Sequence, residues 1–189
     1  NYANIAEEVG VSQVTIKNWI SVLSRTGLIY LLQPYYSNHL TRAIKTPKLY
    51  FRDTGLVCYL SRWNSYESLE YSAVAGNMFE TFVVSEIIKS FTNEGLEYDF
   101  NLFYYRGKDK FKNSDTDKTV EKEVEIDLIV EENGTLYPIE IKKSANPTAS
   151  MASAFGVLDK VADKKRGTGV ILCQYDQKLY LKEDLVVLP

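Results

Sequence analysis

The chain has 189 residues and a net charge of −3, and its 45% apolar and 25% charged residues are typical of a folded globular protein. Two cysteines and a single histidine, His39, argue against a disulfide framework, a zinc site and a Ser-His-Asp hydrolase. No apolar run approaches the length of a membrane helix, no secretory signal opens the chain, and no Walker-type loop for ATP occurs. We therefore expect a cytoplasmic protein without a membrane partner.

The first 26 residues have the pattern of a helix-turn-helix. Residues 4–10 predict a short helix that Asn4 caps and Gly10 ends, and Ser12 caps a second helix that runs to about Thr26. This second helix has an apolar stripe that is expected to be buried and consists of Ile16, Ile20 and Leu23, with Trp19 beside them. Its other face presents side chains able to bind base edges or phosphates in the major groove, namely Gln13, Lys17 and Asn18. A helical hairpin that only packs on a neighbouring element is the alternative.

Two apolar segments, residues 28–34 and 48–51, predict strands on either side of a polar stretch, as in the wing that follows a recognition helix. Arg42 and Lys45 in that stretch are candidates for phosphate contacts, or else belong to a solvated loop. Residues 1–52 carry a net charge of +4 and the remainder −7, which suggests a polyanion-binding end. We therefore predict a winged helix-turn-helix over residues 1–52, with DNA as its partner.

Residues 53–75 predict a helical connector, in which Asp53 caps a short helix that ends at Leu60. Gly76 then precedes a long helix over residues 77–91, and Glu80 falls in the middle of its apolar face. A carboxylate aimed at a core costs several kcal/mol unless it is paired or bound to a metal. Glu80 is therefore either a structural salt-bridge partner or part of a functional site.

Residues 101–106 predict a strand, and the charged stretch 107–123 predicts a long exposed loop. A hairpin follows, because alternating residues 124–130 and residues 135–143 flank an Asn-Gly turn signal. Its first strand is expected to place Val124, Ile126, Leu128 and Val130 on one face, and Glu125, Asp127 and Ile129 on the other. A helix over residues 149–161 and an apolar strand over residues 169–173 predict a sheet covered by helices on both faces.

The hairpin presents Asp127, Glu140 and Lys142 on one side. Mg²⁺ takes one or two carboxylates and keeps several waters, and a neighbouring lysine can orient or deprotonate an attacking water. The alternative is a polar hairpin face on which Lys142 pairs with Asp127 or Glu140, an interaction worth less than about 1 kcal/mol.

Glu80, Asp127 and the sequence Glu140-Ile141-Lys142 resemble, in this order, the motif of the PD-(D/E)XK nuclease superfamily. The resemblance implies that Asp127 and Glu140 bind Mg²⁺ or Mn²⁺, that Glu80 is an auxiliary ligand, and that Lys142 is the catalytic lysine. The usual proline before the Asp is replaced by Ile126.

A narrower resemblance covers nearly the whole chain and rests on KLYFRDTGL (48–56), GNMFETFV (76–83), FYYR (103–106), EID (125–127) and YPIEIK (137–142). These segments are similar to the C-terminal region of a family of prokaryotic AAA-type ATPases. The resemblance implies an α/β fold, with a winged helix-turn-helix followed over residues 76–189 by a restriction-endonuclease-like sandwich around a central mixed sheet. It also implies that this chain, which begins at Asn1, is a fragment whose ATP site lies in a preceding ATPase domain.

Three functions remain open from the sequence. The first is nucleic-acid binding with Mg²⁺-dependent phosphodiester hydrolysis, which the carboxylate–lysine set favours. The second is a non-catalytic module that docks the ATPase onto a protein partner, which the net acidity of residues 53–189 favours. The third, a transcription repressor, leaves the hairpin residues unexplained.

Overall fold

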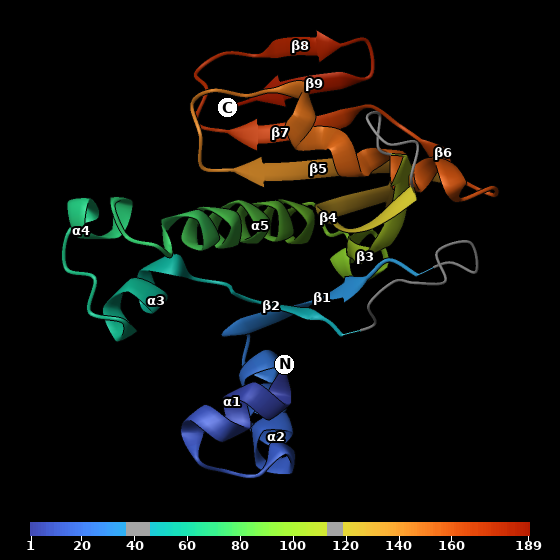
Figure 1. The fold of residues 1–189 in the computed structure, drawn as a ribbon. Coiled ribbons are helices and arrows are strands. Elements are labelled where there is room, and N and C mark those ends of the chain that lie inside the picture. The colour runs from blue at the N-terminus through green and yellow to red at the C-terminus, as the bar shows by residue number, and fades with distance from the viewer. Residues whose placement is uncertain (37–45, 113–118) are drawn as a thin grey trace.

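The computed structural model describes residues 1–36, 46–112 and 119–189, which form one large mixed sheet with helices packed against it (Figure 1). Arg42 and Lys45, the candidate phosphate contacts, lie outside these ranges. Across the sheet the strand order is β2-β1-β3-β4-β5-β7-β9-β8, and β6 pairs with β5 outside this path. The strands are β1 (Ile29–Pro34), β2 (Lys48–Phe51), β3 (Leu102–Lys112), β4 (Thr119–Glu132), β5 (Thr135–Lys142), β6 (Lys165–Arg166), β7 (Gly169–Cys173), β8 (Leu179–Lys182) and β9 (Leu185–Leu188).

The sheet combines antiparallel and parallel pairing, as the sequence predicts. β3, β4 and β5 are antiparallel neighbours, whereas β5, β7 and β9 run parallel. β1 and β2 form an antiparallel pair, and β1 joins the rest of the sheet through a short parallel contact of Gln33 and Pro34 with β3. The two strands expected to form a wing are therefore continuous with the central sheet.

Helices lie on both faces of this sheet. The helices of the described ranges are α1 (Tyr2–Val9), α2 (Gln13–Arg25), α3 (Thr54–Leu60), α4 (Tyr66–Glu70), α5 (Ala75–Asn93) and the 3₁₀ segments η1 (Tyr98–Phe100) and η2 (Ala149–Lys160). On one face, Val84 and Ile88 of α5 share a core with residues of β1, β2, β3, β4 and β5. On the other, Phe155 and Leu158 of η2 pack on the remaining core of the sheet. The predicted helix over 149–161 is thus a 3₁₀ segment, interrupted at Ala152.

The curvature of the sheet brings its first two strands onto α5. Tyr30 and Leu32 of β1 and Tyr50 of β2 belong to the same buried cluster as Leu128 of β4 and Ile139 of β5. Figure 1 shows α5 lying between the β1–β2 pair and the strands β5 and β7. Side chains of β2 can therefore approach residues of β4 that lie three strands away in the sheet order.

Two predicted features of the N-terminal helical pair are present, namely the Ser12 cap of α2 and the turn at Gly10. The Ser12 hydroxyl accepts the Thr15 N–H, and Gly10 ends α1 with a φ of 77°. The first cap is Asn1 rather than Asn4, because the Asn1 side chain accepts the Ala3 N–H and α1 begins at Tyr2. A separate core holds the pair against β1, and it is centred on Ala6, Ile16, Ile20 and Ile29.

The predicted loop over residues 107–123 was wrong, because most of it extends the β3–β4 hairpin. Opposite charges face each other across the strands, as in Lys108 with Glu123 and Asp109 with Lys122. Arg106 also donates from Nε to Glu123 Oε1 at 2.7 Å. Such cross-strand pairs stabilise an antiparallel ladder by roughly 0.2–1 kcal/mol each, which a count of charged residues along the sequence does not reveal.

A bulge interrupts β4 at the position of Asp127. Phe103 of β3 pairs with Ile129 of β4, and Tyr105 pairs with Ile126. The two β3 residues are two positions apart and their β4 partners are three apart, so β4 carries one extra residue. The strict alternation predicted for residues 124–130 was therefore wrong. Ile126 and Ile129 lie in the core under η2, whereas Leu128 lies in the core under α5.

None of the helices in the described ranges combines the length and the apolar character needed to cross a bilayer.

Candidate functional site

Asp127 and Glu140 are the two buried charged residues of the described ranges, with 6% and 7% of their surfaces exposed. They lie just beyond the last ladder pair of β4 with β5, which joins Leu128 to Ile139. The Asp127 carboxylate accepts the Ile141 N–H through Oδ2 at 2.9 Å. A side chain thus replaces a strand carbonyl as the partner of this N–H, and the bulge in β4 places it there.

Lys142 is the third member of this cluster. It lies two residues after Glu140 on β5, and its Nζ is 2.5 Å from Glu140 Oε1 and 3.6 Å from Asp127 Oδ2. The other Glu140 oxygen, Oε2, is buried and has no hydrogen-bond partner in the described structure. The structure therefore brings together Asp127, Glu140 and Lys142, the three hairpin residues selected from the sequence.

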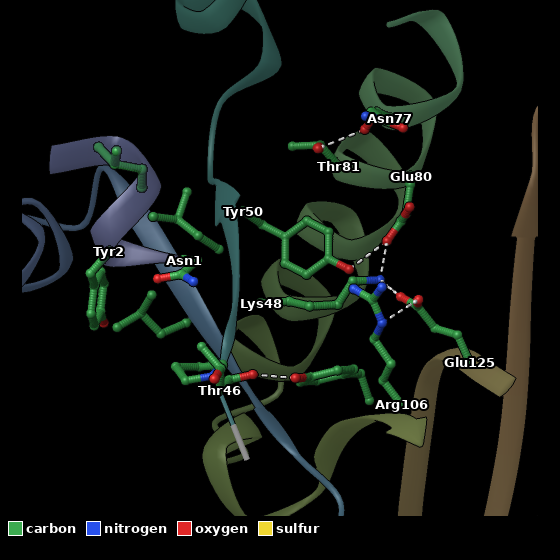
Figure 2. A pocket seen from close by; sticks show the side chains of 15 residues that line it. Asn1, Tyr2, Thr46, Lys48, Tyr50, Asn77, Glu80, Thr81, Arg106 and Glu125 are labelled. Carbon is green, nitrogen blue, oxygen red and sulfur yellow. Dashed lines mark hydrogen bonds and ion pairs between the residues drawn. The ribbon is translucent and has the colours of Figure 1, made fainter. Parts of the chain in front are cut away.

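Glu80 is connected to the cluster of Asp127, Glu140 and Lys142 by Lys48, a residue that the sequence analysis did not select. Its Oε1 accepts from Lys48 Nζ at 2.9 Å and from the Tyr50 hydroxyl at 2.5 Å. Lys48 Nζ also lies 2.6 Å from Glu125 Oε1 and 3.9 Å from Asp127 Oδ1. Figure 2 shows Lys48 reaching from β2 toward Glu80 on α5 and Glu125 on β4. The inward-pointing carboxylate on the apolar face of α5 is thus part of an ion-pair network.

Lys48 and Tyr50 occupy alternate positions in β2, so both side chains lie on the same side of that strand. This alternation was available in the sequence. A lysine two residues from a tyrosine in an otherwise apolar strand points to the same side as that tyrosine. If that side is buried, the lysine needs an acidic partner nearby.

The buried acids have raised pKa values. Burial raises the pKa of Glu140 to about 7, and the Asp127 charge adds to this, whereas Lys142 opposes it. Burial and then Glu80 raise the pKa of Asp127, against the Ile141 N–H and the two lysines. Burial alone would lower the pKa values of Lys48 and Lys142, but their acidic partners raise both by more. Both lysines are therefore ammonium groups at neutral pH.

The Asp127 and Glu140 side chains fit a divalent cation by their chemistry. Glu140 Oε2 is a buried oxygen without a partner, and Mg²⁺ is satisfied by one or two carboxylates together with water. Glu80 is separated from this pair by the Lys48 ammonium. Within the described residues no three acidic, histidine or cysteine side chains are arranged around one metal position. Of the three ligands implied by the sequence resemblance, Asp127 and Glu140 are the pair that could hold the ion.

A polar cleft of about 780 Å³ borders the network. Figure 2 shows its walls, with Asn1 and Tyr2 on one side and Asn77, Glu80 and Thr81 of α5 on the other. Arg106 contributes a further cation, 3.6 Å from Glu125 Oε2. The cleft therefore runs between α1 and α5, with β2 and residues of β3 and β4 along it.

The side chains predicted to contact nucleic acid are only partly within the described ranges. Gln13, Lys17 and Asn18 are exposed on α2, as a recognition helix requires. The expectation that Trp19 belongs to the buried stripe was wrong, because its side chain is 49% exposed whereas Ile16 and Ile20 are buried. Trp19 adds an apolar element to the surface of α2.

Comparison with known proteins places the chain in a family. Residues 75–189, more than half of the chain, match the family described as Domain of unknown function (DUF4143), and the chain belongs to that family. Residues 1–67 match a second family, Domain of unknown function (DUF8612).

Two mycobacterial proteins are similar to the chain. They are the uncharacterized protein Rv2008c of Mycobacterium tuberculosis and the uncharacterized protein Mb2031c of Mycobacterium bovis, each 26% identical over 157 residues. The match covers 83% of this chain but 31% of each relative, so the chain spans less than a third of their length. No solved structure shows significant similarity to the chain.

Proposed function

We propose that this chain is a nucleic-acid-binding region that hydrolyses phosphodiester bonds with a divalent cation held by Asp127 and Glu140. The observation that carries the proposal is the convergence of two buried carboxylates, one with an unpartnered oxygen, on a lysine at the point where β4 and β5 stop pairing. It agrees with the PD-(D/E)XK motif and with a restriction-endonuclease-like sandwich. In the longer protein, an AAA-type ATPase domain would precede this region and bind ATP.

Each residue of the site has a role set by its environment. Asp127 and Glu140 would hold Mg²⁺ or Mn²⁺, which when bound polarises a phosphoryl oxygen and lowers the pKa of its water. The Lys142 side chain is 44% exposed, so its head can reach a substrate in solvent. Because its acidic partners keep it protonated, Lys142 acts by orienting water and stabilising phosphoryl charge rather than as a base.

The N-terminal elements supply the binding surface in this proposal. In it, α1 and α2 act as a helix-turn-helix and β1 and β2 as its wing, so that Gln13, Lys17 and Asn18, which are exposed on α2, would face the major groove. The cleft beside α1 is lined by Lys48 and Arg106, so a strand bound along it would pass both cations. Lys48 in turn lies 3.9 Å from Asp127 Oδ1. Affinity for DNA should fall steeply with salt, because each neutralised phosphate releases counterions.

The test compares wild type with Asp127→Asn and Lys142→Met on plasmid and single-stranded DNA, with Mn²⁺ or Mg²⁺. Asn keeps the size of Asp127 and an oxygen for the Ile141 N–H, so the fold should persist. We expect wild type to cleave, both variants to lose cleavage by at least about 100-fold, and all three to bind DNA with similar salt dependence. Binding without cleavage by wild type would refute hydrolysis while leaving nucleic-acid binding in place.

A second candidate function, docking onto a protein partner, is favoured by the exposed surface of α2. Val14, Trp19 and Val22 are 67%, 49% and 58% exposed on the helix that would otherwise face DNA. Aromatic and apolar side chains of this kind are typical of protein interfaces. Absence of DNA binding even at low salt, combined with loss of partner capture in Trp19→Ala, would favour this function.

A further inference from the structure

Lys48 occupies a position where a cation is enclosed by acidic groups. Its ammonium contacts Glu80 at 2.9 Å and Glu125 at 2.6 Å, and it lies 5.8 and 5.6 Å from the ring centres of Tyr50 and Tyr104. Carboxylates and aromatic faces both attract cations. Lys48 is therefore bound by β4, α5 and the aromatic residues around it, although it belongs to the N-terminal strand pair.

The two oxygens of Asp127 meet different groups. Oδ2 accepts the Ile141 N–H and lies near Lys142, whereas Oδ1 faces Lys48 at 3.9 Å. A divalent ion that binds Asp127 through Oδ1 would approach the Lys48 ammonium closely. Like charges a few ångströms apart repel even in a well-screened environment, and the repulsion doubles for a divalent ion.

We propose that Lys48 is an internal counter-ion that competes with the divalent cation of the Asp127–Glu140 pair. Metal binding and the attachment of β2 to the carboxylates are then antagonistic, so the N-terminal elements control occupancy of the metal site. This inference rests on the proposed function, because it requires a cation at Asp127 and Glu140. A merely structural Lys48 would change stability but not metal affinity.

The experiment is calorimetric titration of Mn²⁺ into Glu80→Gln and Lys48→Met/Glu80→Gln, with wild type, Lys48→Arg and Lys89→Met alongside. The Glu80→Gln background removes one of the two carboxylates that lose Lys48 in Lys48→Met, and the other, Glu125, keeps Arg106 at 3.6 Å, so the double variant should fold. Comparing the two Gln variants isolates the effect of Lys48. We expect Mn²⁺ to bind the double variant about tenfold or more tightly than Glu80→Gln.

The two control variants separate charge from position. Lys48→Arg retains a cation and should show no gain in Mn²⁺ affinity over wild type. Lys89 pairs with Glu86 on an exposed turn of α5, so Lys89→Met tests the loss of a distant positive charge and should leave the affinity unchanged.

Equal Mn²⁺ affinity in Glu80→Gln and the double variant, with measurable binding in both, would overturn the competition and leave the proposed metal site standing. No Mn²⁺ binding in any of the five proteins would overturn both. Binding that becomes detectable only once Lys48 is removed would support the competition directly.

Discussion

Replacing Lys48 with methionine is expected to lower the free energy of unfolding by about 2–4 kcal/mol. The change leaves Glu80 and Glu125 without their shared cation, and a half-buried charge that loses its partner is strongly destabilising. Adding Glu80→Gln should restore part of the loss, because it removes one of the two carboxylates left without Lys48 and its amide oxygen can still accept the Tyr50 hydroxyl. Urea unfolding of wild type, the two single variants and the double variant gives the coupling energy.

Lys89→Met is the matched control for this cycle, because its pair with Glu86 is about half exposed. Exposed pairs of this kind contribute roughly 0–1 kcal/mol. If Lys48→Met were no less stable than Lys89→Met, the network around Lys48 would have no energetic role.

Replacing Glu140 with glutamine is expected to stabilise the protein at pH 8 by roughly 2–3 kcal/mol and to have little effect near pH 4.5. The pKa of Glu140 is about 7 in the folded protein, above its ordinary value of 4.5. Between these values the folded state holds a proton that the unfolded state has released, so stability falls as pH rises. Glutamine removes this ionisation.

The measurement is the free energy of unfolding of wild type and Glu140→Gln from pH 4.5 to 8.5. Glu132→Gln, at the exposed end of β4, controls for the loss of one negative charge. The curves for wild type and Glu140→Gln should diverge with increasing pH, whereas Glu132→Gln should run parallel to wild type. A Glu140→Gln variant less stable than wild type at pH 8 would show that the ion pair with Lys142 outweighs the burial of the carboxylate.

Much of the local structure could be predicted from the sequence, because it depends on neighbouring residues. The caps at Ser12 and Asp53, the left-handed turn at Gly10 and the Asn133-Gly134 hairpin turn are short-range signals, and each is present in the structure. β2 and β7 also have the bounds that their apolar composition predicts. The terminal strands β8 and β9 were missed.

The errors concern features that depend on partners distant in sequence. Pairing of oppositely charged residues turns a predicted loop into the β3–β4 ladder, and the bulge at Asp127 exists only because β3 lies opposite. The same difference applies to the residues of the candidate site. Asp127, Glu140 and Lys142 lie on adjacent strands and could be grouped from sequence, whereas Lys48 reaches them only because the sheet curves around α5.

The proposed function requires that Asp127 and Glu140 together hold a divalent cation. Anomalous scattering from a crystal soaked in Mn²⁺ tests it most directly, because manganese is located without assumption about its ligands. We expect a manganese peak within coordination distance of Asp127 Oδ1 and Glu140 Oε2, with Glu80 still hydrogen-bonded to Tyr50 rather than bound to the metal. A soaked crystal with no peak there, and with Lys142 still paired to Glu140, would contradict it.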